Sequence, residues 1–212
     1  MIKIQAKRVE RLVRAYHEGI AGPEQEDAIV TAFGIPRTDD LPLAELARLH
    51  RQYGLSNYIH EATAIEEIRE IFRAINLAPG HCFMDIGAGY GAVVLYGAAL
   101  TRARFCAVEA VPGRAVELAR AARRLGFDHV EVMEQGAGDV DHSRADFVFL
   151  NNPFLGEENR RYLRRLRGQI RRSCRVIAIN NIVAEFRQSP DFAELRHSAA
   201  IAEYKFGLFA PA

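Results

Sequence analysis

Two patterns of apolar residues divide the chain near residue 80. Before it, apolar residues recur every three or four positions, as they do on one face of an amphipathic helix. The clearest such stretch is 64–75, and further helices are expected from the N-terminus to Tyr16, over 24–33 and over 41–53. Gly22-Pro23 and Gly34-Ile35-Pro36 interrupt them. We therefore expect residues 1–80 to form a helical cap.

After residue 80, short apolar runs alternate with helical stretches. Strands are predicted over 82–86, 104–108, 130–133, 146–150 and 175–179, and helices over 92–100, 114–125 and 157–172. Runs around 193–197 and 201–209 are expected to close the sheet as a hairpin. Apolar strands without alternation are typical of parallel sheets buried on both faces. The pattern thus predicts an α/β fold over 81–212, with a doubly wound, Rossmann-like, mostly parallel sheet.

Composition narrows the class of protein without naming a partner. The 28 Lys and Arg nearly balance the 27 Asp and Glu. No apolar run reaches the roughly 18 residues of a membrane span, and the charged N-terminus is unlike a signal peptide. The three cysteines and the scattered histidines lack metal-ligand spacing. We expect a cytoplasmic protein with no membrane partner and no metal, and the oligomeric state stays open.

The strongest motif is a glycine loop, Asp85-Ile-Gly87-Ala-Gly89-Tyr-Gly91, between the first strand and its helix. Glycines there permit a tight turn and the close approach of a ligand to the backbone. Glu109 ends the second strand, where a carboxylate can accept hydrogen bonds from both ribose hydroxyls. The alternative interpretation is a simple turn in which Asp85 caps the helix.

The same glycines also match the dinucleotide fingerprint, so an oxidoreductase has to be weighed. Asp85 stands where a dinucleotide site usually has an apolar residue, and a carboxylate there suits a ligand that carries an ammonium group. No proton-relay residue accompanies the loop. These features favour S-adenosyl-L-methionine over a dinucleotide.

A second motif, Asn151-Asn152-Pro153-Phe154, follows the fourth strand. Ligands of doubly wound sheets bind beyond the carboxyl ends of the strands, so this motif and the glycine loop should face one crevice. An Asn carbonyl can orient a substrate N–H, and the flat Phe154 ring can pack on the acceptor. We expect Asn151, Asn152 and Phe154 to act in catalysis. A capped turn is the alternative.

The layout of 81–212 resembles the class I S-adenosylmethionine-dependent methyltransferases. The resemblance implies that Asp85, Gly87, Gly89 and Gly91 hold the amino-acid end of the cofactor, with Asp85 also ordering the loop. It further implies that Glu109 holds the ribose. That family usually places an acid against the adenine after the third strand. Here Gln135 and Asp139 are the candidates for that contact.

The Asn motif is similar to the Asn-Pro-Pro-Tyr of amine-directed methyltransferases. It also resembles the Asn-Asn-Phe of the histone-lysine methyltransferases that lack a SET domain, the disruptor-of-telomeric-silencing family. Tyr53-Gly54 resembles that family's Tyr-Gly loop, and Ala92-Val-Val-Leu95 its segment after the glycines. The resemblance implies methylation of an amine nitrogen, with a protein as the preferred acceptor and with Tyr53 near the cofactor. An RNA or DNA amine, or a non-catalytic binding module, are the alternatives.

Two further expectations concern surfaces. The segment 53–63 joins the helical cap to the helix before the first strand and is expected to form a lid over the cofactor. The helix from 157 carries an arginine stripe of Arg160, Arg164, Arg167 and Arg171. Such a stripe can contact phosphates or an acidic protein, or it can simply be a solvated helix face.

Overall fold

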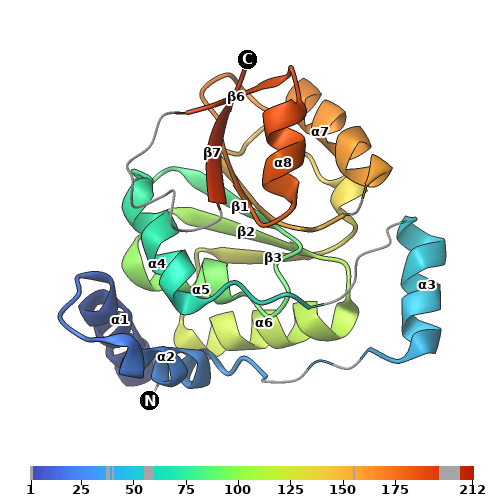
Figure 1. Cartoon of the computed structure of the whole chain (residues 1–212). Helices are drawn as coiled ribbons and strands as arrows, with labels where there is room; N and C mark the ends of the chain where they lie inside the picture. The colour runs from blue at the N-terminus through green and yellow to red at the C-terminus, as the bar shows by residue number, and fades with distance from the viewer. Residues whose placement is uncertain (1, 37–38, 40, 55–59, 155, 196–205) are drawn as a thin grey trace.

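A seven-stranded sheet forms the centre of the computed structural model, which describes residues 2–36, 39, 41–54, 60–154, 156–195 and 206–212 (Figure 1). The strand order is β3-β2-β1-β4-β5-β7-β6. The strands are β1 (Cys82–Ile86), β2 (Arg104–Glu109), β3 (Val130–Glu134), β4 (Phe147–Asn151), β5 (Arg175–Ile179), β6 (Phe192–Glu194) and β7 (Phe206–Pro211). Strands β1 to β5 pair in parallel, whereas β7 runs antiparallel to β5 and β6. The predicted Rossmann-like fold is confirmed. Strands β6 and β7 pair antiparallel as expected of a closing hairpin, and residues 196–205 of the expected runs lie outside the described residues.

Helices cover both faces of this sheet. They are α1 (Ile2–His17), α2 (Glu26–Phe33), α3 (Leu43–Tyr53), α4 (Ile65–Ala74), α5 (Ala92–Leu100), α6 (Pro112–Leu125), α7 (Glu157–Gln169) and α8 (Ile182–Gln188), with short 3₁₀ turns η1 (Pro23–Gln25) and η2 (Ala137–Asp139). Two of the differences from the expected elements have a clear physical reason. Helix α7 ends at Gln169 because Ile170 turns into the core, and the seven-residue α8 is too short to show a periodic pattern.

The strands are apolar throughout because each face of the sheet meets its own helical layer. Phe83, Phe105 and Phe149 point to the layer of α1, α2, α4, α5 and α6. Their neighbours Met84 and Cys106 point instead to the layer of α7 and α8. Successive strand residues face opposite sides of a sheet, so one run of apolar residues supplies both cores.

Helix α5 is apolar on all sides, and this explains why the N-terminal helices pack against it. Its residues 93–99 are buried, between the sheet on one side and α1 and α4 on the other. A helix that is apolar all round needs cover on all sides. Residues from before position 80, among them Val13, Phe33 and Ile71, therefore belong to the same core cluster as α5. The division of the chain at residue 80 stays a prediction about its organisation.

Helix α3 lies apart from the other N-terminal helices, at the edge of the sheet where β1 to β5 end (Figure 1). It is held by a small apolar cluster of its own, in which Leu49 packs on Val111 at the start of α6. Among the described residues, we find no helix that is both long and apolar enough for a bilayer.

Candidate active site

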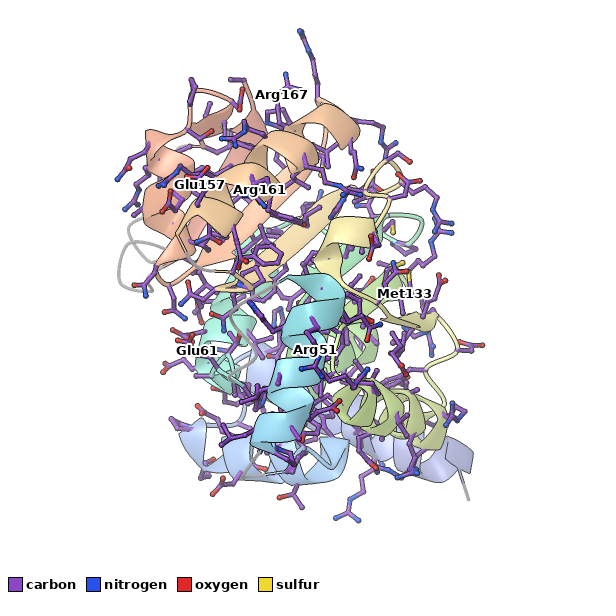
Figure 2. All side chains as sticks on the ribbon, turned by 90° about the vertical axis from the view of Figure 1, so that its right-hand side faces the viewer. Arg51, Glu61, Met133, Glu157, Arg161 and Arg167 are labelled. Atoms are coloured by element: carbon purple, nitrogen blue, oxygen red, sulfur yellow. The ribbon has the colours of Figure 1, made fainter. Side chains whose placement is uncertain are left out.

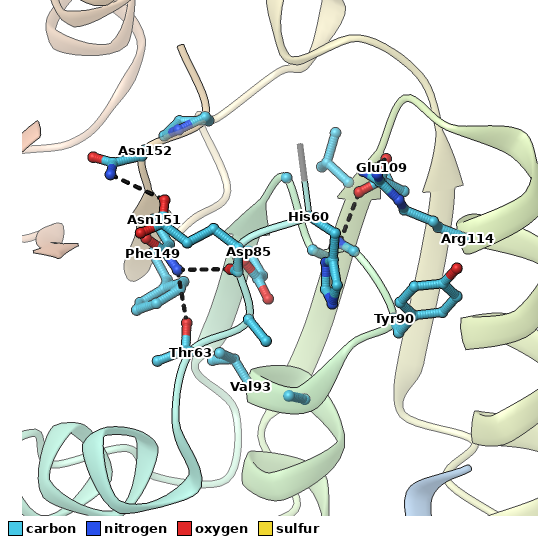
Figure 3. A pocket seen from close by; sticks show the side chains of 18 of the residues that line it. His60, Thr63, Asp85, Tyr90, Val93, Glu109, Arg114, Phe149, Asn151 and Asn152 are labelled. Atoms are coloured by element: carbon cyan, nitrogen blue, oxygen red, sulfur yellow. Dashed lines mark hydrogen bonds and ion pairs between the residues drawn. The ribbon is translucent and has the colours of Figure 1, made fainter. Parts of the chain in front are cut away.

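A pocket opens at the carboxyl edge of the sheet, between β1 and β4, where the strand order reverses (Figure 3). The glycine loop and Glu109 line one part of it. The Asn151-Asn152-Pro153-Phe154 motif lines another, together with the segment from His60 to Thr63. The two motifs are in near contact, since a Cβ atom added to Gly87 would lie 3.6 Å from the Cβ of Pro153. The expected shared crevice is therefore present.

The glycine loop is held by the end of β2. Gly87, Gly89 and Gly91 all have positive φ angles, which glycine adopts at little cost. The N–H groups of Gly87 and Ala88 both donate to the carbonyl of Val108, at 2.9 Å each. The N–H of Gly89 donates to the Glu109 carboxylate at 2.7 Å. Because these donors are engaged within the protein, the loop offers a ligand close approach rather than these N–H groups.

The acid that bonds to this loop is Glu109 rather than Asp85. Glu109 also accepts from the N–H of Val111 at 2.8 Å. Burial raises the pKa of Glu109, while these N–H donors and Arg114 act against the rise. The expectation that Asp85 orders the loop is thus not met by any hydrogen bond in the described part of the chain.

Asp85 is a buried carboxyl group that faces the pocket. Its residue is 2% exposed, and no hydrogen bond to it is found among the described residues. Burial, and then repulsion from Glu109, raise the pKa of Asp85 to about 8. A buried carboxyl without a partner is costly when ionised, unless a cation or a donor arrives. Asp85 can therefore receive a ligand's ammonium group.

A buried ion pair ties the N-terminal segment to this wall of the pocket. Arg114 of α6 donates to the carboxylate of Asp39, with Nε at 2.9 Å, and lies 3.9 Å from Glu109. The hydroxyl of Tyr90 donates to the same Asp39 at 2.8 Å. The sequence pattern did not single out Asp39, Tyr90 or Arg114, because their association depends on contacts between distant segments.

His60 covers the glycine loop. Its ring lies edge-on to Tyr90, with centroids 5.1 Å apart, and a Cβ atom at Gly89 would approach the ring to 2.9 Å. Burial and the nearby Arg114 lower the pKa of His60, which favours the neutral imidazole. His60 belongs to the segment 53–63 that was expected to cover the cofactor, but it was not singled out, since a lone histidine in a loop carries no periodic signal.

Three asparagine amides and Glu61 form a hydrogen-bonded cluster at the ends of β4 and β5. The Asn151 amide donates to the backbone carbonyl of Glu61 at 3.0 Å and to Thr63 Oγ1 at 3.1 Å. Its carbonyl accepts from the Asn180 amide at 2.8 Å. Asn152 and Asn180 also donate to the Glu61 carboxylate, at 3.2 and 3.3 Å. Asn151 and Asn152 are therefore both at the pocket, and Glu61 and Asn180 are additions that sequence reasoning missed.

Of the remaining expected site residues, two line the pocket and two do not. Gln135 and Phe154 line the pocket, although the Phe154 ring also packs on Tyr162 with centroids 4.6 Å apart. Asp139 is exposed and does not line the pocket, so Gln135 is the better placed of the two adenine candidates. Tyr53 does not line it either. Its ring packs beside Gly136, next to Gln135.

The predicted lid is described only in part. Residues 55–59 lie outside the described residues, and the flanking His60 to Thr63 line the pocket. Of the predicted arginine stripe, Arg160, Arg164 and Arg167 lie on α7, whereas Arg171 lies beyond the end of that helix at Gln169. Arg160 binds Glu157 at 2.7 Å, and Arg171 binds Asp146 at 2.8 Å. These pairs agree with a solvated helix face.

The pocket chemistry fits S-adenosylmethionine. The buried Asp85 carboxyl, which has no hydrogen-bond partner in the described part of the chain, faces it, and a second carboxylate, Glu109, stands at the end of β2, where a ribose hydroxyl can donate. An acid-lined pocket of this kind suits a cationic ligand better than an anionic one. Among the described residues, no group of three or more His, Cys, Asp or Glu could hold a metal ion.

Comparison with known proteins identifies a family. The family model described as "Histone methylation protein DOT1" matches residues 43–205, which is more than half of the chain. That range includes both motifs, Glu61 and Asn180. No curated protein sequence matches the chain.

Solved structures share the fold at low sequence identity. An RNA methyltransferase from Salinibacter ruber, in complex with S-adenosyl-L-homocysteine, has 18% identity and a TM-score of 0.51, and covers 82% of this chain and 94% of its own. The mitomycin 7-O-methyltransferase MmcR has 15% identity and a TM-score of 0.56, over 69% of this chain and 53% of its own. The B. subtilis M1A22 tRNA methyltransferase TrmK has 16% identity and a TM-score of 0.54, over 69% and 65%. At these identities the likeness shows the fold alone.

Proposed function

The chain belongs to the DOT1 histone methylation family of S-adenosylmethionine-dependent methyltransferases, and from this premise we propose that it methylates an amine nitrogen on a protein side chain. The observation that carries the proposal is one shared pocket. A buried acid and the glycine loop lie beside an Asn-rich cluster of hydrogen-bonding groups. An RNA amine is the alternative acceptor, because RNA methyltransferases are among the structures that share the fold.

When bound, the cofactor supplies an activated sulfonium methyl group, so the protein's main task is to align the nucleophile. We assign the cofactor to Asp85, Gly87, Gly89, Gly91 and Glu109, with Gln135 beside the adenine. Phe154 would flank the acceptor. Asn151 would orient the acceptor nitrogen through Oδ1, because its amide group is already directed to Glu61 and Thr63. One lone pair of Oδ1 accepts from Asn180, and the second remains for a substrate N–H.

The acceptor class can be tested with isotope-labelled S-adenosylmethionine, purified core histones and total RNA. We expect label on the histone fraction. Label on RNA alone would overturn the protein acceptor. Binding of S-adenosylhomocysteine without label on either fraction would favour a non-catalytic module.

A cytoplasmic location is a further prediction, which imaging of the tagged protein would check.

We expect Asn151→Ala to lower the methylation rate by roughly 100-fold, the scale on which a misplaced reactant slows a reaction. Cofactor affinity should stay within about threefold, because the orienting contact acts on the nucleophile and not on the cofactor. Single-turnover rates and calorimetry with S-adenosylhomocysteine measure the two effects. Asn181→Ala is the matched control, since the Asn181 side chain is exposed and does not line the pocket. A wild-type rate in Asn151→Ala would refute the positioning role.

A further inference from the structure

Glu61 is an exposed residue of the pocket wall whose carboxylate is held in place by side-chain amides from two strands. We propose that this carboxylate first receives the acceptor in its ammonium form, which loses one proton to solvent before its lone pair attacks the methyl group. Glu61 is thereby a specificity-determining residue that favours alkylamines, which are charged at neutral pH, over amines that are uncharged there. The inference rests on the proposed function, because it concerns the acceptor side of the same pocket.

The direction of the amides is set by a backbone donor. Asn152 Oδ1 accepts from the N–H of Ile182 at 3.0 Å, so the amide group of Asn152 must face the other way, toward Glu61 Oε2. Asn180 has a similar constraint, since its amide group reaches both Asn151 Oδ1 and Glu61 Oε1. The two donors thus hold one carboxylate oxygen each. The carboxylate is fixed before any acceptor arrives.

The backbone conformation of Asn152 and Asn180 helps to direct their side-chain amides toward Glu61. Asn152 and Asn180 have φ angles of 42° and 65°, in the left-handed region that asparagine tolerates better than most residues. Both follow directly on the ends of their strands, β4 and β5. The two strand ends therefore turn at the same level and bring their amides to one carboxylate.

Glu61 retains the capacity to bind a cation. An ionised carboxylate has about four acceptor positions, and the two amides occupy two of them. The other carboxyl groups at the pocket are buried, and Glu109 is already bonded to the loop. Arg114, a cation of the same pocket, is paired with Asp39 on the far wall. Glu61 thus offers an incoming ammonium group an accessible negative charge beside Asn151.

A charged acceptor gains more here than a neutral one. Both an ammonium group and a neutral amine can donate a charge-assisted hydrogen bond to the carboxylate, but only the ammonium group adds direct charge attraction. A neutral nucleobase amine or hydroxyl would gain only a neutral–ionic contact, without charge attraction. The cluster should therefore discriminate between acceptors by charge.

The test is a titration in which n-butylammonium is added to the protein saturated with S-adenosylhomocysteine. NMR signals of the asparagine side-chain amides are recorded at each addition. n-Butanol serves as a neutral probe of the same shape. Glu61→Gln keeps the size and an acceptor but removes the charge. Glu157→Gln is the matched control, because it removes the same charge on the same side of the molecule but outside the pocket lining (Figure 2).

We expect n-butylammonium, and not n-butanol, to shift the Asn152 and Asn180 amide signals. Glu61→Gln should weaken this binding at least tenfold and raise the KM for histones by a similar factor, with kcat and cofactor affinity little changed. Glu61→Asp should recover part of the effect, and it provides the second variant if Glu61→Gln does not fold. Equal titrations in wild type and Glu61→Gln, or equal shifts with n-butanol, would overturn the inference.

These outcomes are distinct from a failure of the proposed function. If the wild-type protein methylates histones while Glu61→Gln has an unchanged KM and titration, only the role of Glu61 is wrong. If the wild-type protein labels RNA and no histone, the protein acceptor is wrong, and the charge-selective role of Glu61 falls with it.

Discussion

The buried carboxyl group of Asp85 determines how cofactor binding and protein stability should depend on pH. Its carboxyl group has no hydrogen-bond partner among the described residues, and burial raises its pKa to about 8. In the cofactor-free protein at neutral pH it is therefore largely protonated. A ligand's ammonium group would favour the ionised form, so binding should be coupled to the loss of a proton.

We expect the affinity for S-adenosylhomocysteine to rise as pH increases from 6 to about 8, by up to tenfold per unit. Asp85→Asn should bind more weakly and lose this dependence, because it cannot ionise. Calorimetry across the pH range measures both effects. Asp139→Asn is the control, since Asp139 is exposed and away from the pocket lining. If Asp85→Asn keeps the wild-type pH profile, Asp85 is not the titrating group.

The same raised pKa predicts the stability of the cofactor-free protein. An unfolded Asp titrates near pH 3.9, so between about pH 4 and 8 the folded state holds a proton that the unfolded state has lost. The contribution of Asp85 to stability is thus fully present below pH 4 and is lost as pH rises toward 8. Asp85→Asn should therefore become more stable relative to wild type across that window. Denaturant titrations at pH 5 and 8 check the sign, and a constant difference would contradict it.

At the scale of elements, arginines cap the ends of helices that they do not belong to. Arg124 of α6 donates to the last carbonyls of α2, at 3.1 Å to Ala32 and 2.8 Å to Phe33. Arg73 of α4 donates to His17 at the end of α1, with Nε at 2.9 Å. The last carbonyls of a helix lack intrahelical donors and carry partial negative charge. The Arg124 cap therefore joins α2 to α6 of the Rossmann-like layers, and the Arg73 cap joins the N-terminal helices α1 and α4 to each other.

We expect Arg124→Gln to lower the free energy of unfolding by about 1.5–3 kcal/mol, the range for hydrogen bonds made by charged groups. Arg123→Gln, at an exposed position on the same helix, should change it by less than about 0.5 kcal/mol. Urea denaturation measures both variants. Equal stability of the two would show that the cap on α2 contributes nothing measurable.

At the scale of the whole molecule, the N-terminal helices differ in whether they pack into the main core or into a small separate cluster. Phe33 of α2 is 0% exposed within the main core, whereas Leu49 of α3 is equally buried but in a small separate cluster. Truncation of a core side chain costs its transfer free energy and leaves a cavity. In a small cluster the same truncation can be absorbed by local opening.

Phe33→Ala should therefore lower global stability by about 3–5 kcal/mol. Leu49→Ala should mainly increase hydrogen exchange in α3 and at the start of α6, with a smaller change in the unfolding midpoint. Denaturation together with hydrogen-exchange mass spectrometry separates the two responses. If Leu49→Ala lowers global stability as much as Phe33→Ala does, α3 belongs to the main cooperative unit.

The sequence by itself determined the order of the strands and of the longer helices, and it identified the two motifs. The runs 82–86, 92–100 and 175–179 are found with unchanged bounds, because apolar period and glycine breaks are local properties. The adjacency of the glycine loop and the Asn motif also followed from the sequence, since both lie at carboxyl ends of strands in a doubly wound sheet.

Only the tertiary structure decided which side chains complete the pocket. Glu61 meets Asn180 across 119 residues, and Asp39 meets Arg114 across 75. Contacts over such separations depend on how the layers pack, and no periodicity encodes them. The same packing moved Tyr53 out of the pocket lining and gave the loop-ordering contact to Glu109. It also raised the pKa of Asp85, because burial is a property of the folded core and not of the residue.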